Sequence, residues 1–134
     1  MIECGWVMKK LEDKIVEYFN MWLKKDFSKI EEIFEDDIIY SESYGPEYHG
    51  LVQVGKWFAD WGRHATVLEW NVKEFISKGN KIVAEWYYEC NFDGVIYGFD
   101  GVSIVEFNEN EKIYSIKEFK SKAEHNSPYK INSK

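Results

Sequence analysis

Two acidic side chains on extended segments of this sequence could exchange protons with a ligand. Strand alternation in the segment from Lys112 to Lys120 places Glu118 and Lys120 on one face. If aromatic rings enclose that face, the Glu118 carboxyl group is costly to ionise and its pKa rises. The short β-rich segment from Asp37 to Ser43 offers a second acid, Glu42. Two such acids close together could act as one acid and one base near neutral pH.

Other placements of these two acids remain open. Glu42 could be a solvated acid at a strand end. A register slip would turn Glu118 outward, or Glu118 could be a structural partner of Lys120. Tyr18 lies on an apolar helix face, where it serves either as core or as a hydrogen-bond donor. His49 lies in a loop, where a solvated or capping role is the alternative to a proton shuttle.

Metal ligation and nucleophilic catalysis find no support in the residue spacing. The histidines His49, His64 and His125 are scattered, without the HxH, ExxH or CxxC spacing of metal sites. Cys4 and Cys90 lie far apart, and neither has an obvious base. We therefore expect free thiols in a reducing cytoplasm, no metal and no cofactor.

Aromatic residues make up 18% of the 134 residues, which is high for a soluble domain. They could form a compact core of large side chains or wall a cavity, because ligand pockets are lined mainly by apolar and aromatic groups. Alternation assigns two sets of side chains to common strand faces: Trp86, Tyr88 and Cys90 on one strand, and Gly101, Ser103, Val105 and Phe107 on the next.

Composition and charge argue against several classes of partner. The net charge is −7 and Arg63 is the only arginine, whereas nucleic-acid binding needs clustered basic residues. No segment approaches the roughly 20 apolar residues of a membrane span. The segment from Met1 to Lys10 has no basic region followed by an apolar one, so no signal peptide is expected. The expected location is the cytoplasm.

The first half of the chain predicts three helices. Apolar residues recur with helical period from Leu11 to Lys25. Ser28 with Glu31 fits a capping box that would open a short second helix. A third helix is predicted from Leu51 to Trp61.

The second half predicts an antiparallel sheet. Long runs rich in Val, Ile and aromatic residues are separated by turn residues such as Asp93-Gly94. Helices followed by such a meander are typical of an α+β domain. We expect one domain over residues 1–121 and a polar tail over 122–134. The predicted strands are Thr66–Ile76, Lys81–Phe92, Val95–Phe107 and Lys112–Lys120.

The chain resembles the NTF2-like superfamily, and in particular its SnoaL-like and ketosteroid-isomerase-like members. The strings DFSKIEEIFEDDIIY, EYHGLVQVGKWF and FDGVSIVEFNENEKIYSIKEF resemble, in order and spacing, segments of that fold. The likeness covers nearly the whole domain. It implies a cone in which three N-terminal helices pack on a curved, mainly antiparallel sheet around one internal pocket. The superfamily hosts many activities, so the resemblance does not assign one.

Ketosteroid isomerase supplies possible roles through this resemblance. In that enzyme a first-strand carboxylate moves a proton, while a tyrosine and a protonated aspartate hydrogen-bond the enolate. The resemblance places the carboxylate at Glu42 and the tyrosine at Tyr18. Ser103 stands where the aspartate would be, and this departure weakens the case for steroid isomerisation in particular.

The family register also directs Glu118 into the same aromatic chamber as Glu42. The implied catalytic set is therefore Glu42, Tyr18 and Glu118, assisted by Ser103 and His49. The side chains expected to contact the ligand are Trp22, Trp57, Trp86, Tyr88, Val105 and Phe107.

These residues lead to three functional hypotheses. The first is a cofactor-free isomerase, dehydratase or cyclase acting on a small, largely apolar organic molecule. The second is a ligand-binding module without chemistry. The third is an association domain, because NTF2-like domains commonly dimerise through the outer sheet face. We expect a homodimer, and the apolar residues predicted on that face are Val83, Tyr87, Val102 and Ile104.

Overall fold

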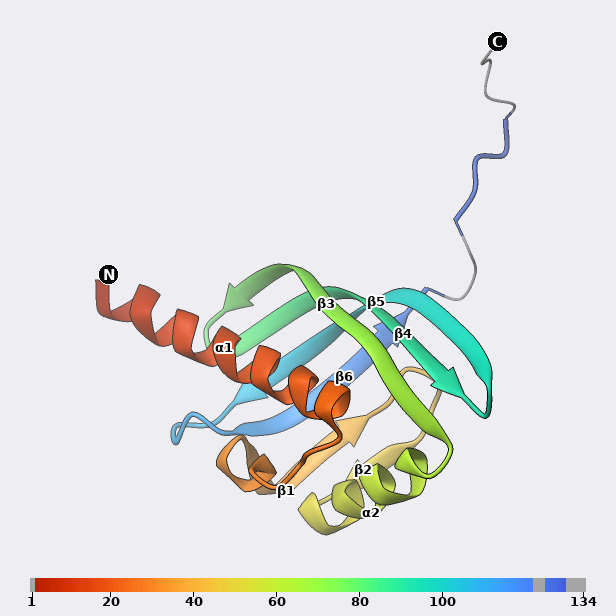
Figure 1. The fold of residues 1–134 in the computed structure, drawn as a ribbon. Coiled ribbons are helices and arrows are strands. Elements are labelled where there is room, and N and C mark those ends of the chain that lie inside the picture. The colour runs from red at the N-terminus through yellow and green to blue at the C-terminus, as the bar shows by residue number, and fades with distance from the viewer. Residues whose placement is uncertain (1, 122–124, 130–134) are drawn as a thin grey trace.

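The computed structural model has an α+β architecture and describes residues 2–121 and 125–129. Over these residues two helices pack on the concave side of a six-stranded sheet with the order β2-β1-β6-β5-β4-β3 (Figure 1). The elements are α1 (Ile2–Lys24), the 3₁₀ turn η1 (Ile30–Glu32), β1 (Phe34–Ser41), β2 (Glu47–His49), α2 (Leu51–Gly62), β3 (Ala65–Lys78), β4 (Lys81–Phe92), β5 (Val95–Phe107) and β6 (Ile113–Lys120).

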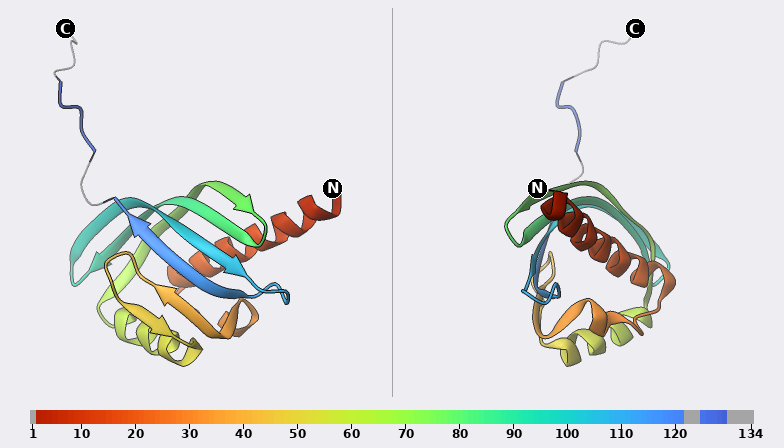
Figure 2. Two further views of the ribbon diagram at one scale, coloured as in Figure 1. Left: turned by 180° about the vertical axis from the view of Figure 1, so that it is seen from behind. Right: turned by 90° about the vertical axis from the view of Figure 1, so that its left-hand side faces the viewer.

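Helix α1 lies against the sheet through the apolar stripe that its sequence predicts. Leu11, Ile15, Phe19 and other members of this stripe are buried. Figure 2 shows the strongly curved sheet bending around this helix. The helix ends where Lys25 adopts a positive φ of 54°, and the Asp26 amide then bonds the carbonyl of Met21. This left-handed residue stops α1 and turns the chain toward η1.

The predicted second helix is wrong. Residues Ile30–Glu32 form only a 3₁₀ turn, and no side chain caps its start. Asp26 instead accepts a hydrogen bond from the Ser28 amide, at 3.0 Å. Phe34 begins β1 and pairs with Ile113 of β6. Pairing with a distant strand therefore overrides the short helical pattern, because a helix of this length is marginal without tertiary support.

Strand β1 joins the sheet through one parallel and one antiparallel neighbour. It runs parallel to β6, with Tyr40 opposite Ile116. It runs antiparallel to β2, with Tyr40 opposite Tyr48. Strand β2 has only three residues and was not predicted from the sequence. This hairpin brings the segment between the two strands, including Glu42, to one end of the sheet.

The remaining strands form the predicted antiparallel meander. Strands β4 and β5 have the predicted bounds, and Asp93 and Gly94 form their turn with positive φ angles of 50° and 88°. The third predicted helix is α2, which buries Val54 and Phe58. Within the described residues, no helix is long and apolar enough to cross a membrane. Of the predicted tail, residues 125–129 contain no helix or strand, and the other positions from 122 onward lie outside the described residues.

Candidate functional site

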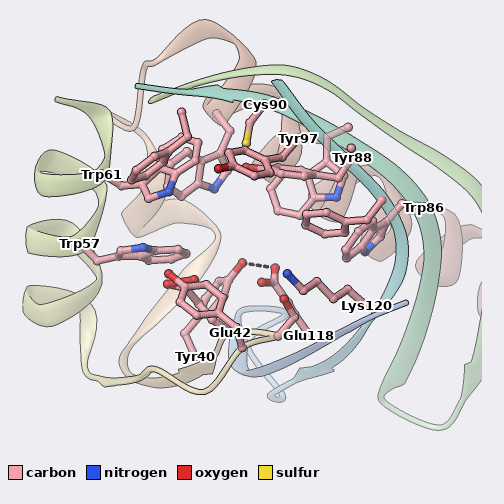
Figure 3. A pocket seen from close by; sticks show the side chains of 17 residues that line it. Tyr40, Glu42, Trp57, Trp61, Trp86, Tyr88, Cys90, Tyr97, Glu118 and Lys120 are labelled. Atoms are coloured by element: carbon pink, nitrogen blue, oxygen red, sulfur yellow. Dashed lines mark hydrogen bonds between the residues drawn. The ribbon is translucent and has the colours of Figure 1, made fainter. Parts of the chain in front are cut away.

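A cavity of about 450 Å³ opens between the concave sheet face and α2 (Figure 3). Every strand except β2 contributes to its wall, and most of the wall is aromatic. This composition follows from alternation, since the inward positions of β3, β4 and β5 carry large rings. The lining residues are Trp22, Tyr40, Glu42, Ser43, Tyr44, Trp57, Trp61, Trp70, Trp86, Tyr88, Cys90, Phe92, Tyr97, Gly98, Phe99, Glu118 and Lys120.

Glu118 is the strongest chemical feature of the cavity. Its carboxyl group accepts a hydrogen bond from the hydroxyl of Tyr40. Burial, and secondarily the charge of Glu42, raise the Glu118 pKa to about 8, although the Tyr40 hydrogen bond acts in the opposite direction. At neutral pH this side chain is therefore mainly a carboxylic acid, which can donate a proton to a bound molecule.

A chain of hydrogen bonds from α1 holds Tyr40 in place. The Tyr18 hydroxyl donates to the Tyr40 hydroxyl at 2.7 Å. The Trp22 indole N–H donates to Tyr18 at 2.9 Å. Burial raises the pKa of both tyrosines well above the usual value, so both hydroxyls stay protonated at neutral pH. Each hydroxyl therefore donates in the direction of Glu118, and this series of hydrogen bonds orients the Glu118 carboxyl group.

Glu42 occupies a different environment in the same cavity. The Tyr48 hydroxyl donates to its carboxylate at 2.7 Å, and the Tyr44 hydroxyl also hydrogen-bonds it. Burial raises the Glu42 pKa, while these two tyrosines oppose the rise because they stabilise the ionised form. Glu42 and Glu118 lie on the same side of the cavity, across from Trp61 and Tyr88 (Figure 3).

Several residues predicted to be in the site lie beside the cavity rather than in its wall. Tyr18 and Ser103 are buried behind the wall; Tyr18 contacts Tyr40, and Ser103 accepts a 2.9 Å hydrogen bond from the Trp86 indole. Val105 and Phe107 are buried in the core. They lie further along β5 than the cavity does, which corrects the prediction that they contact a ligand.

His49 is also placed away from the cavity. Its ring is exposed and lies 3.0 Å from the carboxylate of Glu47 at the sheet edge. Pairing with β1 puts His49 opposite Ile39, on the face that points away from the helices. Strand alternation turns it outward, and this position corrects the expectation that it assists inside the pocket.

The structure brings four of the six predicted ligand-contact residues to the cavity wall: Trp22, Trp57, Trp86 and Tyr88. The sequence reasoning overlooked Tyr40, although alternation from Glu42 puts Tyr40 on the same face of the first strand. Tyr48 had no sequence signal, because its contact with Glu42 depends on the short β1–β2 hairpin.

Comparison with known proteins agrees with this architecture. The model of the SnoaL-like domain family matches residues 15–116. A candidate SnoaL-like polyketide cyclase from Shewanella putrefaciens CN-32 superimposes with a TM-score of 0.73 and 11% identity, covering 83% of this chain and 89% of its own. An NTF2-like protein of unknown function from Burkholderia pseudomallei K96243 gives a TM-score of 0.73 and 14% identity, covering 83% and 90%.

A protein with a ketosteroid isomerase-like fold from Catenulispora acidiphila DSM 44928, solved with trimethylamine, gives a TM-score of 0.68 at 15% identity, covering 79% of this chain and 83% of its own. No curated protein matches the sequence. Identities this low establish the shared fold alone. The family match spans most of the chain, from the middle of α1 into β6. The chain therefore belongs to the SnoaL-like domain family.

Proposed function

We propose that the protein binds a small, largely apolar organic molecule in this cavity and exchanges protons with it through Glu118 and Glu42. The observation that carries the proposal is Glu118, a carboxyl group held by Tyr40 in an aromatic chamber with a pKa of about 8. An acid with this pKa can give and take a proton near neutral pH. The corresponding reaction classes are cofactor-independent isomerisation, dehydration and cyclisation.

The two acids have different roles in this proposal. Glu42 ionises first, because Tyr48 and Tyr44 stabilise its carboxylate. Glu42 is then the base, and protonated Glu118 is the acid. Tyr40 orients Glu118, and Tyr18 acts through Tyr40 without reaching the ligand. Ser103 fixes the Trp86 ring in the wall.

A model elimination reaction tests for proton abstraction without knowledge of the natural substrate. In 5-nitrobenzisoxazole, a base removes the C3 proton, the C–H electron pair forms the nitrile, and the N–O bond breaks to give a coloured phenolate. We expect the elimination rate to reach a plateau at neutral pH, where Glu42 is the base. The rate should rise further near pH 8, where Glu118 becomes ionised. Glu118→Gln should remove that rise, with a rate loss of about a hundredfold at pH 9.

Two variants should shift the midpoint pH of this rate increase in opposite directions, which would assign the increase to Glu118. Tyr40→Phe removes a hydrogen bond that lowers the Glu118 pKa, so the midpoint should increase. Glu42→Gln removes a nearby charge that raises this pKa, so the midpoint should decrease and the neutral plateau should vanish. Glu109→Gln, exposed in the turn between β5 and β6, is the matched control and should leave the profile unchanged. A rate no greater than that of free acetate would contradict the catalytic proposal.

A non-catalytic ligand-binding module is the alternative, and the same measurements distinguish it. Its expected result is saturable binding of the probe, detected by the change in tryptophan fluorescence, with no product formed. The many tryptophans in the wall make this signal sensitive, because Trp57, Trp61 and Trp86 would all contact an occupant.

We also propose that the outer sheet face forms a homodimer. The observation favouring it is an apolar band across four neighbouring strands of this face. Phe119 of β6 lies opposite Val102 of β5. Ile104 of β5 lies opposite Val83 of β4, and Val83 pairs with Ile76 of β3. Phe119 and Ile76 are 52% and 59% exposed. Exposed apolar surface of this kind is typical of association sites.

Phe119→Glu should convert the dimer to a monomer in sedimentation or light-scattering experiments at tens of micromolar protein. Its side chain is half-exposed, so the fold should persist. Tyr87 is less suitable for this test, because its hydroxyl bonds Glu89 within the same chain. Val95→Glu, an equally exposed position on the opposite sheet face, should leave the assembly unchanged. A wild-type monomer at this concentration would refute the proposal.

A further inference from the structure

The cavity wall contains two acids, and within the described residues neither of them forms an ion pair. Glu42 and Glu118 lie on one side of it, and among the described residues of its wall only Lys120 carries a positive charge. The Lys120 ammonium lies over the ring of Phe99, at 4.7 Å from the ring centroid. No ion pair in the described part of the chain joins Lys120 to either acid. A cation inside the cavity would therefore find carboxyl groups that have no partner cation.

The opposite side of the cavity is made of ring faces and edges. Trp61, Tyr88 and Trp86 are arranged across from the two acids, and Trp57 closes one end (Figure 3). The negative face of an aromatic ring attracts a cation, most strongly where water is excluded. Lys120 already uses this attraction at Phe99, and its ammonium also lies 5.9 Å from the ring of Tyr44.

An anionic ligand is disfavoured by the same geometry. An anion in the cavity would lie against the Glu42 carboxylate and against the electron-rich ring faces. A neutral apolar ligand would satisfy the rings but leave the acids without a counter-charge. A ligand with an apolar body and one positive charge satisfies both sides, because its body packs among the rings while its charge lies near the carboxyl groups.

We propose that this cavity selects organic cations, namely molecules with an apolar body and a tertiary or quaternary ammonium group. The inference rests on the proposed ligand-binding function and specifies its ligand class. Glu42 supplies negative charge, and a cation bound nearby lowers the Glu118 pKa, so that Glu118 also ionises when the cavity is occupied. The rings of Trp57, Trp61 and Trp86 supply the cation–π surface. Lys120 limits the affinity, because its own ammonium repels the incoming one.

A pair of isosteric probes isolates the contribution of the charge. Phenyltrimethylammonium and tert-butylbenzene have nearly the same shape and differ in one positive charge. Binding of each to the full chain at pH 7 can be measured by ligand-observed NMR, with tryptophan fluorescence as a second readout. We expect phenyltrimethylammonium to bind about tenfold or more tightly than its isostere, as expected of a cation–π contact in a partly desolvated site.

Three variants should alter this preference in defined directions. Glu42→Gln and Glu118→Gln should each reduce it severalfold while leaving tert-butylbenzene affinity within twofold, and that second measurement also shows that the variants are folded. Lys120→Met should increase the affinity for the cation, because it removes the competing ammonium. Glu109→Gln, exposed in the turn between β5 and β6, is the matched control and should change neither affinity.

The possible results separate this inference from the function on which it rests. Equal affinity for both probes, or a cation preference unaffected by all three cavity variants, would overturn the organic-cation class while leaving a ligand pocket in place. Failure of both probes to bind would overturn the pocket as well. A preference that falls with the two glutamine variants and rises with Lys120→Met would support the inference.

Discussion

The wild-type protein should lose folding stability as the pH rises from about 4.5 to about 8, and Glu118→Gln should not show this loss. The folded state raises the Glu118 pKa from 4.5 to about 8, chiefly through burial. Between these pH values the unfolded chain loses the proton and the folded chain keeps it, so increasing pH favours unfolding. Above pH 8 the folded protein contains an ionised, enclosed carboxylate, and the difference between variant and wild type stops growing.

The expected size of this effect is on the order of a few kcal/mol, since each pKa unit corresponds to about 1.4 kcal/mol. Denaturant unfolding at a series of pH values from 4 to 9 measures it. Glu118→Gln should match the wild type near pH 4 and exceed its free energy of unfolding at pH 9. Glutamine retains an oxygen that can accept the Tyr40 hydrogen bond. Glu109→Gln, exposed in the turn between β5 and β6, should keep the wild-type pH dependence. Parallel curves for Glu118→Gln and wild type would contradict the prediction.

Gly101→Ala should destabilise the fold by about 2 to 3 kcal/mol, because it inserts a methyl group where no space exists. A Cβ at this position would lie 2.4 Å from the carbonyl oxygen of Phe119 and 2.5 Å from the nearest atom of the Trp86 ring. The carbonyl belongs to β6, which pairs with β5 at this point, so it cannot move without disturbing the sheet. The Trp86 ring is buried and bonded to Ser103, so it cannot move easily either.

Gly55→Ala provides the matched control with the opposite sign. Gly55 is exposed in α2, and a Cβ there would meet no atom within 4 Å. Alanine should therefore stabilise the helix by roughly 0.5–1 kcal/mol. Thermal unfolding of both variants at one pH makes the comparison. A neutral Gly101→Ala would show that the contact between Trp86 and β5 is looser than the structure indicates, and the close packing of this wall would have to be revised.

The strand meander and the faces of its side chains were predictable because they depend on local rules. The turn residues Asp93 and Gly94 separate β4 from β5, and both strands have the predicted bounds. A period of two then places Trp86 and Tyr88 together on the cavity side. The long amphipathic pattern of α1 was predictable for the same reason, since helical periodicity over many residues indicates one buried face.

The short elements and the connectivity of the site depended on tertiary structure. Residues around Ile30 carry a helical pattern, but the pairing of Phe34 with Ile113 draws them into a turn and a strand. The resemblance put Tyr18 at the reacting centre, whereas packing places Tyr40 between it and Glu118. A sequence shows which face a residue occupies, because that depends on its near neighbours. Only the folded chain decides which hydroxyl reaches a carboxyl group, because that contact joins strands from opposite ends of the chain.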